Sequence, residues 1–134
     1  MKKEKSSMGR VSVVIIRDKK LLLVTGYNEI FYWTPGGKVK NREEKENTLK
    51  RELNEELKIK AVSIKPYLKY KSIDEINKIK TDIYCYLVSF QGIIRPSKEI
   101  TKYIWMPRED IKKIKISEGI VNNLIPKLIK DNLI

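Results

Sequence analysis

The segment GGKVKNREEKENTLKRELNEEL, residues 36–57, joins a glycine pair to an acidic run. Residues 44–57 contain neither glycine nor proline, so this part is predicted to form a helix. The sequence Pro35-Gly36-Gly37 before the helix is typical of turns and predicts a loop. Four glutamates in the segment surround one arginine: Glu43, Glu52, Glu55 and Glu56 around Arg51.

Three of these glutamates are expected on one face of the helix. With about 100° of rotation per residue, Glu52, Glu55 and Glu56 fall within an arc of about 100°. The leucines of the helix form an apolar stripe that would pack on a sheet: Leu49, Leu53 and Leu57. The carboxylates are therefore predicted to lie on a rigid platform.

The acidic face admits two interpretations. Each pair of like charges at i and i+4 destabilises an exposed helix by roughly a few tenths of a kcal/mol. A positive charge is therefore expected nearby. Lys50, Arg51 and Lys58 would compensate in a plain salt-bridged surface. A divalent cation such as Mg²⁺, which takes oxygen ligands and bridges to phosphates, would compensate more strongly.

The composition indicates one domain. The chain has 134 residues, of which 41% are hydrophobic, enough for a single core. Residues 1–10 are predicted to be a flexible basic lead, followed by one domain over residues 11–134. Neither a membrane span nor a signal peptide is expected, and the predicted location is the cytoplasm.

Residue usage excludes several chemistries. Without histidine, Ser-His-Asp and Cys-His machinery and histidine-bearing zinc sites are excluded. Cys85 lies in an apolar run and is predicted to be a small buried hydrophobe. The net charge of +12 comes mostly from lysine, whereas nucleic-acid readers that need bidentate contacts favour arginine. A nucleic-acid partner is therefore not expected, although polyanionic small molecules would be attracted.

The remaining pattern predicts an α/β (α+β) fold. Residues 11–17 and 21–25 indicate a hairpin, residues 82–90 a central strand covered on both faces, and residues 102–106 a final strand. Residues 61–70 indicate a strand at an edge or with a bulge because of Pro66, and residues 71–80 are turn-like. Ser117 is predicted to cap a closing helix that Pro126 kinks or restarts. Helices on both sides of a mixed β-sheet are expected.

The spacing of the acidic segment resembles a known family motif. Gly37, five residues, Glu43, seven residues and then Arg51-Glu52-Leu53-x-Glu55-Glu56-x-Lys58-Ile59 resembles the Nudix box. All the fixed positions of that box match except one, because Lys58 stands where the pattern has its second glycine. That position lies at the helix exit, where a left-handed backbone is expected, and lysine adopts positive φ at a cost of about 1 kcal/mol. The resemblance implies an α/β/α sandwich over nearly the whole chain.

The resemblance also implies roles for the matching residues. Nudix enzymes cut a phosphoanhydride in a nucleoside diphosphate linked to another group, using water and Mg²⁺ or Mn²⁺. Glu52, Glu55 and Glu56 would bind the metal, and one of the last two would be the general base. Gly37 would offer its carbonyl to a metal. Glu43 and Arg51 would pair and orient the loop on the helix.

Four further residues are candidates for the site. Glu99 precedes the last strand, where many family members recruit another acid. Lys38 would contact a phosphate. Tyr27 and Tyr32, with the neighbouring Phe31, would offer a stacking surface for a base, although aromatic runs beside a strand are more often core.

The substrate is less defined than the family. Residues 74–77 lack both the proline typical of ADP-ribose pyrophosphatases and the tyrosine typical of diadenosine polyphosphate hydrolases. The small size resembles the branch that cleaves (d)NTPs, including oxidised ones, to monophosphate and pyrophosphate. Alternatives are ADP-ribose, a dinucleoside polyphosphate or an RNA 5′ end, and a non-catalytic nucleotide-sensing module. The expected partner is a small nucleotide, with the protein a monomer or a homodimer.

Overall fold

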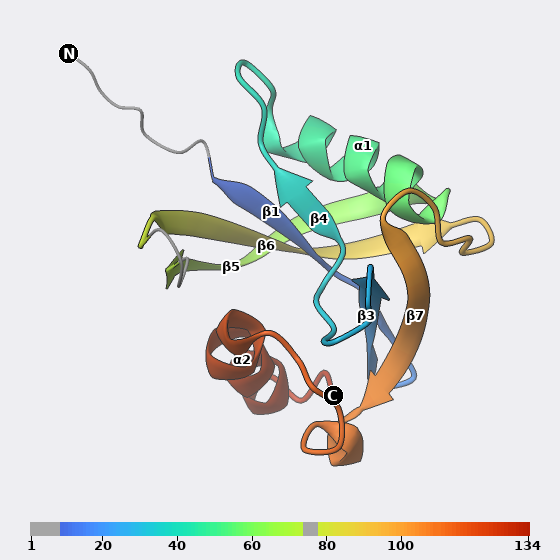
Figure 1. Cartoon of the computed structure of the whole chain (residues 1–134), viewed down its shortest axis with the longest axis vertical. Helices are drawn as coiled ribbons and strands as arrows, with labels where there is room; N and C mark the ends of the chain where they lie inside the picture. Colours follow the sequence, from blue (N-terminus) through green and yellow to red (C-terminus); the bar gives the residue numbers. More distant parts are fainter. Residues whose placement is uncertain (1–8, 74–77) are drawn as a thin grey trace.

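The computed structural model describes residues 9–73 and 78–134 (Figure 1). The described part contains seven strands and four helical segments. The strands are β1 (Arg10–Val14), β2 (Ile16–Arg17), β3 (Lys20–Gly26), β4 (Gly36–Lys38), β5 (Lys60–Ile73), β6 (Lys80–Gln91) and β7 (Ile100–Pro107). The helical segments are α1 (Lys45–Leu57), the 3₁₀ turn η1 (Arg108–Asp110), the π-helical turn η2 (Ile120–Leu124) and α2 (Ile125–Lys130).

The strands form two sheets. The larger sheet has the order β4-β1-β6-β5, and the smaller has the order β2-β3-β7. β1 runs parallel to β6, whereas the β1–β4 and β5–β6 pairs are antiparallel, so the larger sheet is mixed. The parallel pair needs a long crossover, and the chain between β1 and β6 supplies it with β3, β4, α1 and β5.

The two helices cover opposite faces of this framework (Figure 1). The leucine stripe of α1 is completely buried and packs with Val11 and Val13 of β1. Val14, the next residue along the strand, packs with Leu124 and Leu128 on the side of η2 and α2. Successive strand residues point to opposite faces, so one short strand contributes to both cores. The predicted fold class, helices on both sides of a mixed sheet, is confirmed.

The exit of α1 keeps its turn despite the lysine. Lys58 adopts a left-handed conformation (φ 58°, ψ 36°), and its N–H donates to the carbonyl of Asn54. The N–H of Ile59 reaches back to the carbonyl of Leu53, which completes the αL-terminated helix end that glycine usually provides. The substitution therefore adds strain to this turn without changing its shape.

Two predictions about local structure are wrong. Residues 71–73 and Lys80 are not a turn, because β5 and β6 continue into a long hairpin whose residues 74–77 lie outside the described part. Cross-strand pairing supplies the backbone hydrogen bonds that the polar sequence did not signal. Ser117 directly precedes the helical run, and its carbonyl accepts the N–H groups of Ile120 and Val121, both at 3.2 Å. The predicted side-chain cap is absent at the start of η2.

Two predictions about proline are confirmed. β5 is an edge strand, and its register shifts between Pro66 and Leu68. The closing helix restarts at Pro126, which occupies the first turn of α2 directly after the π-helical turn, where its missing N–H costs least. The predicted lead, residues 1–10, lies outside the described part except for its end, where Arg10 is already the first residue of β1.

Candidate active site

The inner end of the site is a buried carboxylate. Glu56 is 3% exposed, near the C-terminal end of α1, and its Oε1 accepts a hydrogen bond from the N–H of Gly36 at 3.2 Å. Burial, together with the negative charges of Glu52 and Glu99, raises the pKa of Glu56 to about 8. The hydrogen bond from Gly36 has the opposite effect and lowers this pKa. In the described residues no basic side chain lies within ion-pair distance of this carboxylate.

The glycine pair of β4 lies directly against the acidic helix. A Cβ at Gly37 would collide with the carboxylate of Glu52, whose Cδ would be 2.6 Å away. Gly36 has φ 138°, a backbone conformation that side chains rarely adopt, and a Cβ there would meet the carbonyl of Val11. The two glycines are therefore required for the edge strand to approach Glu52 and Glu56.

Arg51 organises the outer part of the helix. Its Nε donates to Oε2 of Glu43 at 2.8 Å and its NH2 group donates to Oε1 of the same residue at 3.0 Å. Its NH1 group also reaches Glu52 at 3.0 Å and Glu55 at 3.4 Å. Glu43 is further held by the Lys40 N–H, at 3.0 Å. The Glu43–Arg51 pair thus links the loop after β4 to α1, as the resemblance implies.

Glu99 approaches the same carboxylate from another part of the chain. Its negative charge contributes to the raised pKa of Glu56. The N–H of Ser97 donates to the carbonyl of Glu56 at 2.8 Å, which ties the segment before β7 to the end of α1. Glu99 itself is exposed. The structure therefore places this acid, nominated from sequence alone, in electrostatic reach of the acidic helix.

The carboxylates and Gly37 provide the kind of oxygen donors that Mg²⁺ prefers. Across residues 9–73 and 78–134, no three His, Cys, Asp or Glu side chains are placed as a group that could hold a metal ion. The Arg51 guanidinium contacts both Glu52 and Glu55 in this arrangement. The charge of Glu52 helps to raise the pKa of Glu56, and Gly37 lies against Glu52. A buried carboxylate that lacks a basic partner gains most from a bound cation. The residues present therefore fit a divalent metal at this position.

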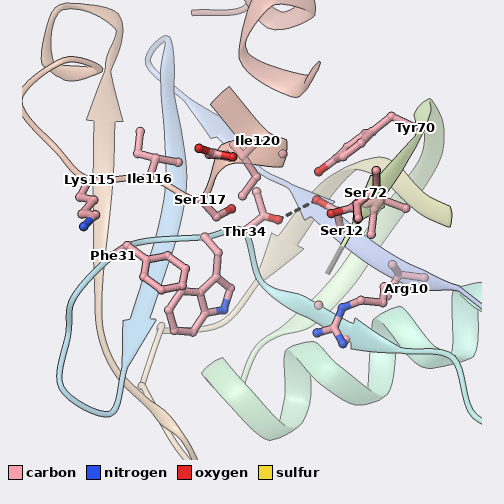
Figure 2. A pocket seen from close by; sticks show the side chains of 18 residues that line it. Arg10, Ser12, Phe31, Thr34, Tyr70, Ser72, Lys115, Ile116, Ser117 and Ile120 are labelled. Carbon is pink, nitrogen blue, oxygen red and sulfur yellow. Dashed lines mark hydrogen bonds between the residues drawn. The ribbon is translucent and has the colours of Figure 1, made fainter. Parts of the chain in front are cut away.

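A pocket of about 640 Å³ lies beside the glycine pair (Figure 2). Gly36 and Gly37 belong both to the pocket wall and to the strand that contacts Glu52 and Glu56. The other walls come from β1, β5, the 31–34 segment and the residues before η2. This volume is in the range of small-molecule sites. The pocket and the acidic helix are thus contiguous through two residues without side chains.

Of the three aromatic residues named from the sequence as a stacking surface, only Phe31 lines the pocket. Phe31 and Trp33 line it, with ring centroids 5.5 Å apart and planes inclined by 56°. Tyr27 is 88% exposed and Tyr32 forms a bridge with Ile116, and neither lines the pocket. The alternation of side chains along an extended segment sends Tyr32 to the opposite side from its two neighbours. The nomination of Tyr27 and Tyr32 as the stacking pair is therefore not supported by this geometry.

Lys38 is exposed at the end of β4, outside the pocket wall, and its carbonyl accepts a 3.4 Å hydrogen bond from Arg51. Sequence reasoning did not nominate several pocket residues, among them Ser12, Thr34, Tyr70 and Ser117. They come from segments more than a hundred residues apart, and no spacing motif joins them. Only the tertiary structure brings them together.

Comparisons with known proteins decide the family. The family model described as NUDIX domain matches residues 7–127. The chain belongs to the NUDIX family. No curated relative matches this Nudix chain.

Solved structures agree with the family assignment. The MutT NUDIX hydrolase from Burkholderia pseudomallei is 24% identical, with a TM-score of 0.73 over 82% of this chain and 89% of that one. The E. coli ORF135 protein is 25% identical, with a TM-score of 0.72 over 89% and 88%. The NUDIX domain of Shewanella oneidensis NrtR, complexed with ADP ribose, is 19% identical, with a TM-score of 0.73 over 98% and 91%.

These findings confirm the predicted family and the Nudix fold. The family match supports the predicted enzyme class, a hydrolase acting on nucleotide pyrophosphates. Among the helices of the described residues, none is long and apolar enough to cross a membrane.

Proposed function

We propose that this Nudix protein hydrolyses nucleoside triphosphates to the monophosphate and pyrophosphate with Mg²⁺, or with Mn²⁺ in its place. One observation carries the proposal: the pocket and the acidic face of α1 share Gly36 and Gly37. A nucleoside in the pocket would direct its phosphates across the glycine pair to the carboxylates. We place this reaction in the cytoplasm.

Different residues of the chain would have different roles in this hydrolysis. Glu52, Glu55, Glu56 and the carbonyl of Gly37 would hold the metal. When bound, Mg²⁺ neutralises the phosphate oxygens and makes a water more acidic. Water adds to a phosphorus, the phosphoanhydride bond breaks, and the leaving oxygen departs with pyrophosphate.

Proton transfer needs a carboxylate close to the attacking water. We assign it to Glu55 or Glu56. Of the two, Glu56 has a pKa that burial raises to about 8, closer to neutrality than that of an exposed carboxyl group. Glu99 would add a further negative charge facing the metal. Glu43 would act only through Arg51, by holding the loop that carries Gly37. Lys38 would meet the outer phosphates from the edge of β4.

The decisive experiment identifies products from a substrate panel with Mg²⁺ and with Mn²⁺. The panel contains (d)NTPs with their 8-oxo forms, ADP-ribose, dinucleoside polyphosphates and 5′-triphosphate RNA. Monophosphate and pyrophosphate from a nucleoside triphosphate are expected, and a Glu55→Gln, Glu56→Gln double variant should lose the activity. Faster cleavage of ADP-ribose, a dinucleoside polyphosphate or RNA would replace the substrate in this proposal. Ligand binding without turnover of any compound would instead favour a nucleotide-sensing module.

A further inference from the structure

The floor of the pocket is a buried pair of hydroxyl groups. Oγ of Ser12 and Oγ1 of Thr34 lie 2.7 Å apart, and either oxygen can donate the proton. The two residues are 4% and 7% exposed. Figure 2 shows the pair between Phe31 on one side of the pocket and Tyr70 on the other. Their mutual hydrogen bond uses one of two protons, so the pair keeps one more donor and free lone pairs.

The thiol of Cys85 lies next to this hydroxyl pair, on the side away from the pocket. Ser12 and Cys85 are direct partners in the parallel ladder between β1 and β6. Burial raises the pKa of Cys85 to about 11, and a hydrogen bond with Ser12 opposes that rise. The thiol therefore keeps its proton at neutral pH and can donate or accept. The Ser12–Thr34 hydrogen bond can run in either direction, and the Cys85 thiol lies beside Ser12 on the neighbouring strand.

Most other side chains that can form hydrogen bonds below the rim of the pocket can also act either as donors or as acceptors. Tyr70, Ser72 and Ser117 carry hydroxyls and line the pocket at intermediate exposure. The indole N–H of Trp33 is the exception there, since it only donates. The charged lining residues are all exposed at the rim: Arg10, Lys115 and Glu118.

Groups of fixed polarity discriminate between ligands only where water is excluded. A buried donor or acceptor that a wrong ligand leaves unpaired costs its full desolvation, whereas a group in water simply returns to water. A reversible hydroxyl pays no such penalty, because it rotates from donor to acceptor. The aromatic wall adds contact to any planar ring, since every base has a π-face.

We propose that this pocket accepts nucleobases of opposite hydrogen-bonding pattern, amino and keto alike, so that the substrate class is nucleoside triphosphates in general and not one oxidised base. The Ser12–Thr34 hydroxyl pair matches either edge by reversing its hydrogen bond, and Phe31 and Trp33 hold the ring by stacking. The inference rests on the proposed function for the phosphates but concerns only the recognition of the base.

The first test compares kcat/KM for dATP, dCTP, dGTP, dTTP and 8-oxo-dGTP under one set of conditions. The expected values lie within about tenfold of one another, whereas sites built to hydrogen-bond one substrate reject analogues by about 10⁴ or more. A preference above about a hundredfold for one base would overturn the inference while leaving hydrolysis established.

Two variants separate stacking from hydrogen bonding. Phe31→Ala is expected to raise KM by about tenfold, to a similar extent for every base, because stacking does not depend on base identity. Tyr27→Ala is the matched control, since Tyr27 is an exposed aromatic residue of the same loop outside the pocket. Thr34→Val, which keeps the shape of the side chain, should weaken all bases alike. A loss confined to one base in either variant would contradict the proposal.

A binding measurement makes the inference independent of turnover. In a Trp105→Phe variant Trp33 is the remaining tryptophan, so its fluorescence reports the pocket directly. Titration with AMP, CMP, GMP and UMP is expected to give Kd values within about tenfold. Equal binding without hydrolysis would end the proposed function but support the inference, whereas binding of none or of only one would overturn it.

Discussion

Gly37 and Glu52 are in direct contact, with the backbone of the edge strand β4 against a carboxylate of α1. The place where a Cβ of residue 37 would stand is occupied by that carboxylate. A side chain at position 37 would therefore force the Glu52 carboxylate or β4 to move. Gly37 also lines the pocket, so the same residue faces both the pocket and Glu52.

The variant Gly37→Ala tests that contact. The added methyl group displaces Glu52 or β4, with an expected loss of about 1–3 kcal/mol in the free energy of unfolding, as for other overpacked sites. Turnover should fall by at least about tenfold, because small misplacements of catalytic groups are costly. Chemical denaturation and kcat/KM measure the two effects. Asn41→Ala, at an exposed position of the following loop, is the control and should change neither.

Glu56→Gln separates metal binding from folding. Without metal, the variant should be at least as stable as the original protein near neutral pH. The raised pKa of Glu56 means that folding must protonate this carboxyl group, a cost that glutamine does not carry, and glutamine keeps an oxygen for the Gly36 N–H. Millimolar Mg²⁺ should raise the melting temperature of the original protein and much less that of the variant. kcat/KM should fall by about a hundredfold or more.

The matched control for this experiment is Glu46→Gln, an exposed glutamate in the first turn of the same helix. It should keep both the Mg²⁺ effect and the activity. An undiminished Mg²⁺ effect in Glu56→Gln would show that the metal binds elsewhere.

The Glu43–Arg51 pair predicts a specific pH dependence of stability. The Arg51 guanidinium, followed by the Lys40 N–H and the Thr48 hydroxyl, lowers the pKa of Glu43 from 4.5 to about 2. Because the pKa is lower in the folded state, the contribution is complete above the unfolded value and is lost as the pH falls from about 4.5 to about 2. Melting temperatures across this range measure it. In Glu43→Gln the acid loss should be shallower, and an unchanged slope would contradict this assignment.

Glu99→Gln should reduce activity without reducing stability. Glu99 is exposed, and its negative charge acts on the buried Glu56. Removing that charge lowers the negative potential facing the metal, so the Mg²⁺ concentration for half-maximal activity should rise by about tenfold. Glu109→Gln, an exposed glutamate in η1, is the control of equal charge. If the two variants behave alike, Glu99 has no part in the site.

Much of the site followed from local sequence because it depends on a single helix. The i, i+3, i+4 spacing of Glu52, Glu55 and Glu56 fixes them on one face whatever the helix packs against. Their environments were not predictable in the same way. Glu56 is buried against Gly36 and Glu55 is held by Arg51, since the approach of β4 decides which side of the face is covered.

The long β5–β6 hairpin shows where local patterns failed. Polar residues near its tip read as a turn, yet Lys71, Ser72 and Ile73 continue the strand. The facing residues of β6 satisfy their backbone groups, and this pairing depends on context more than on the intrinsic preference of the polar residues themselves. Because Ser72 and Ile73 line the pocket, the same error hid part of the pocket wall.

By itself the sequence determined the family, the acidic helix with its leucine stripe, and the glycine pair before it, because each depends on residues close together in the chain. Tertiary structure alone decided the pocket. Ser12 of β1, Thr34 of the loop and Cys85 of β6 become neighbours through sheet pairing and loop docking. Such contacts between distant segments produce no regular spacing of residues in a single sequence, because each residue packs against a partner on another strand.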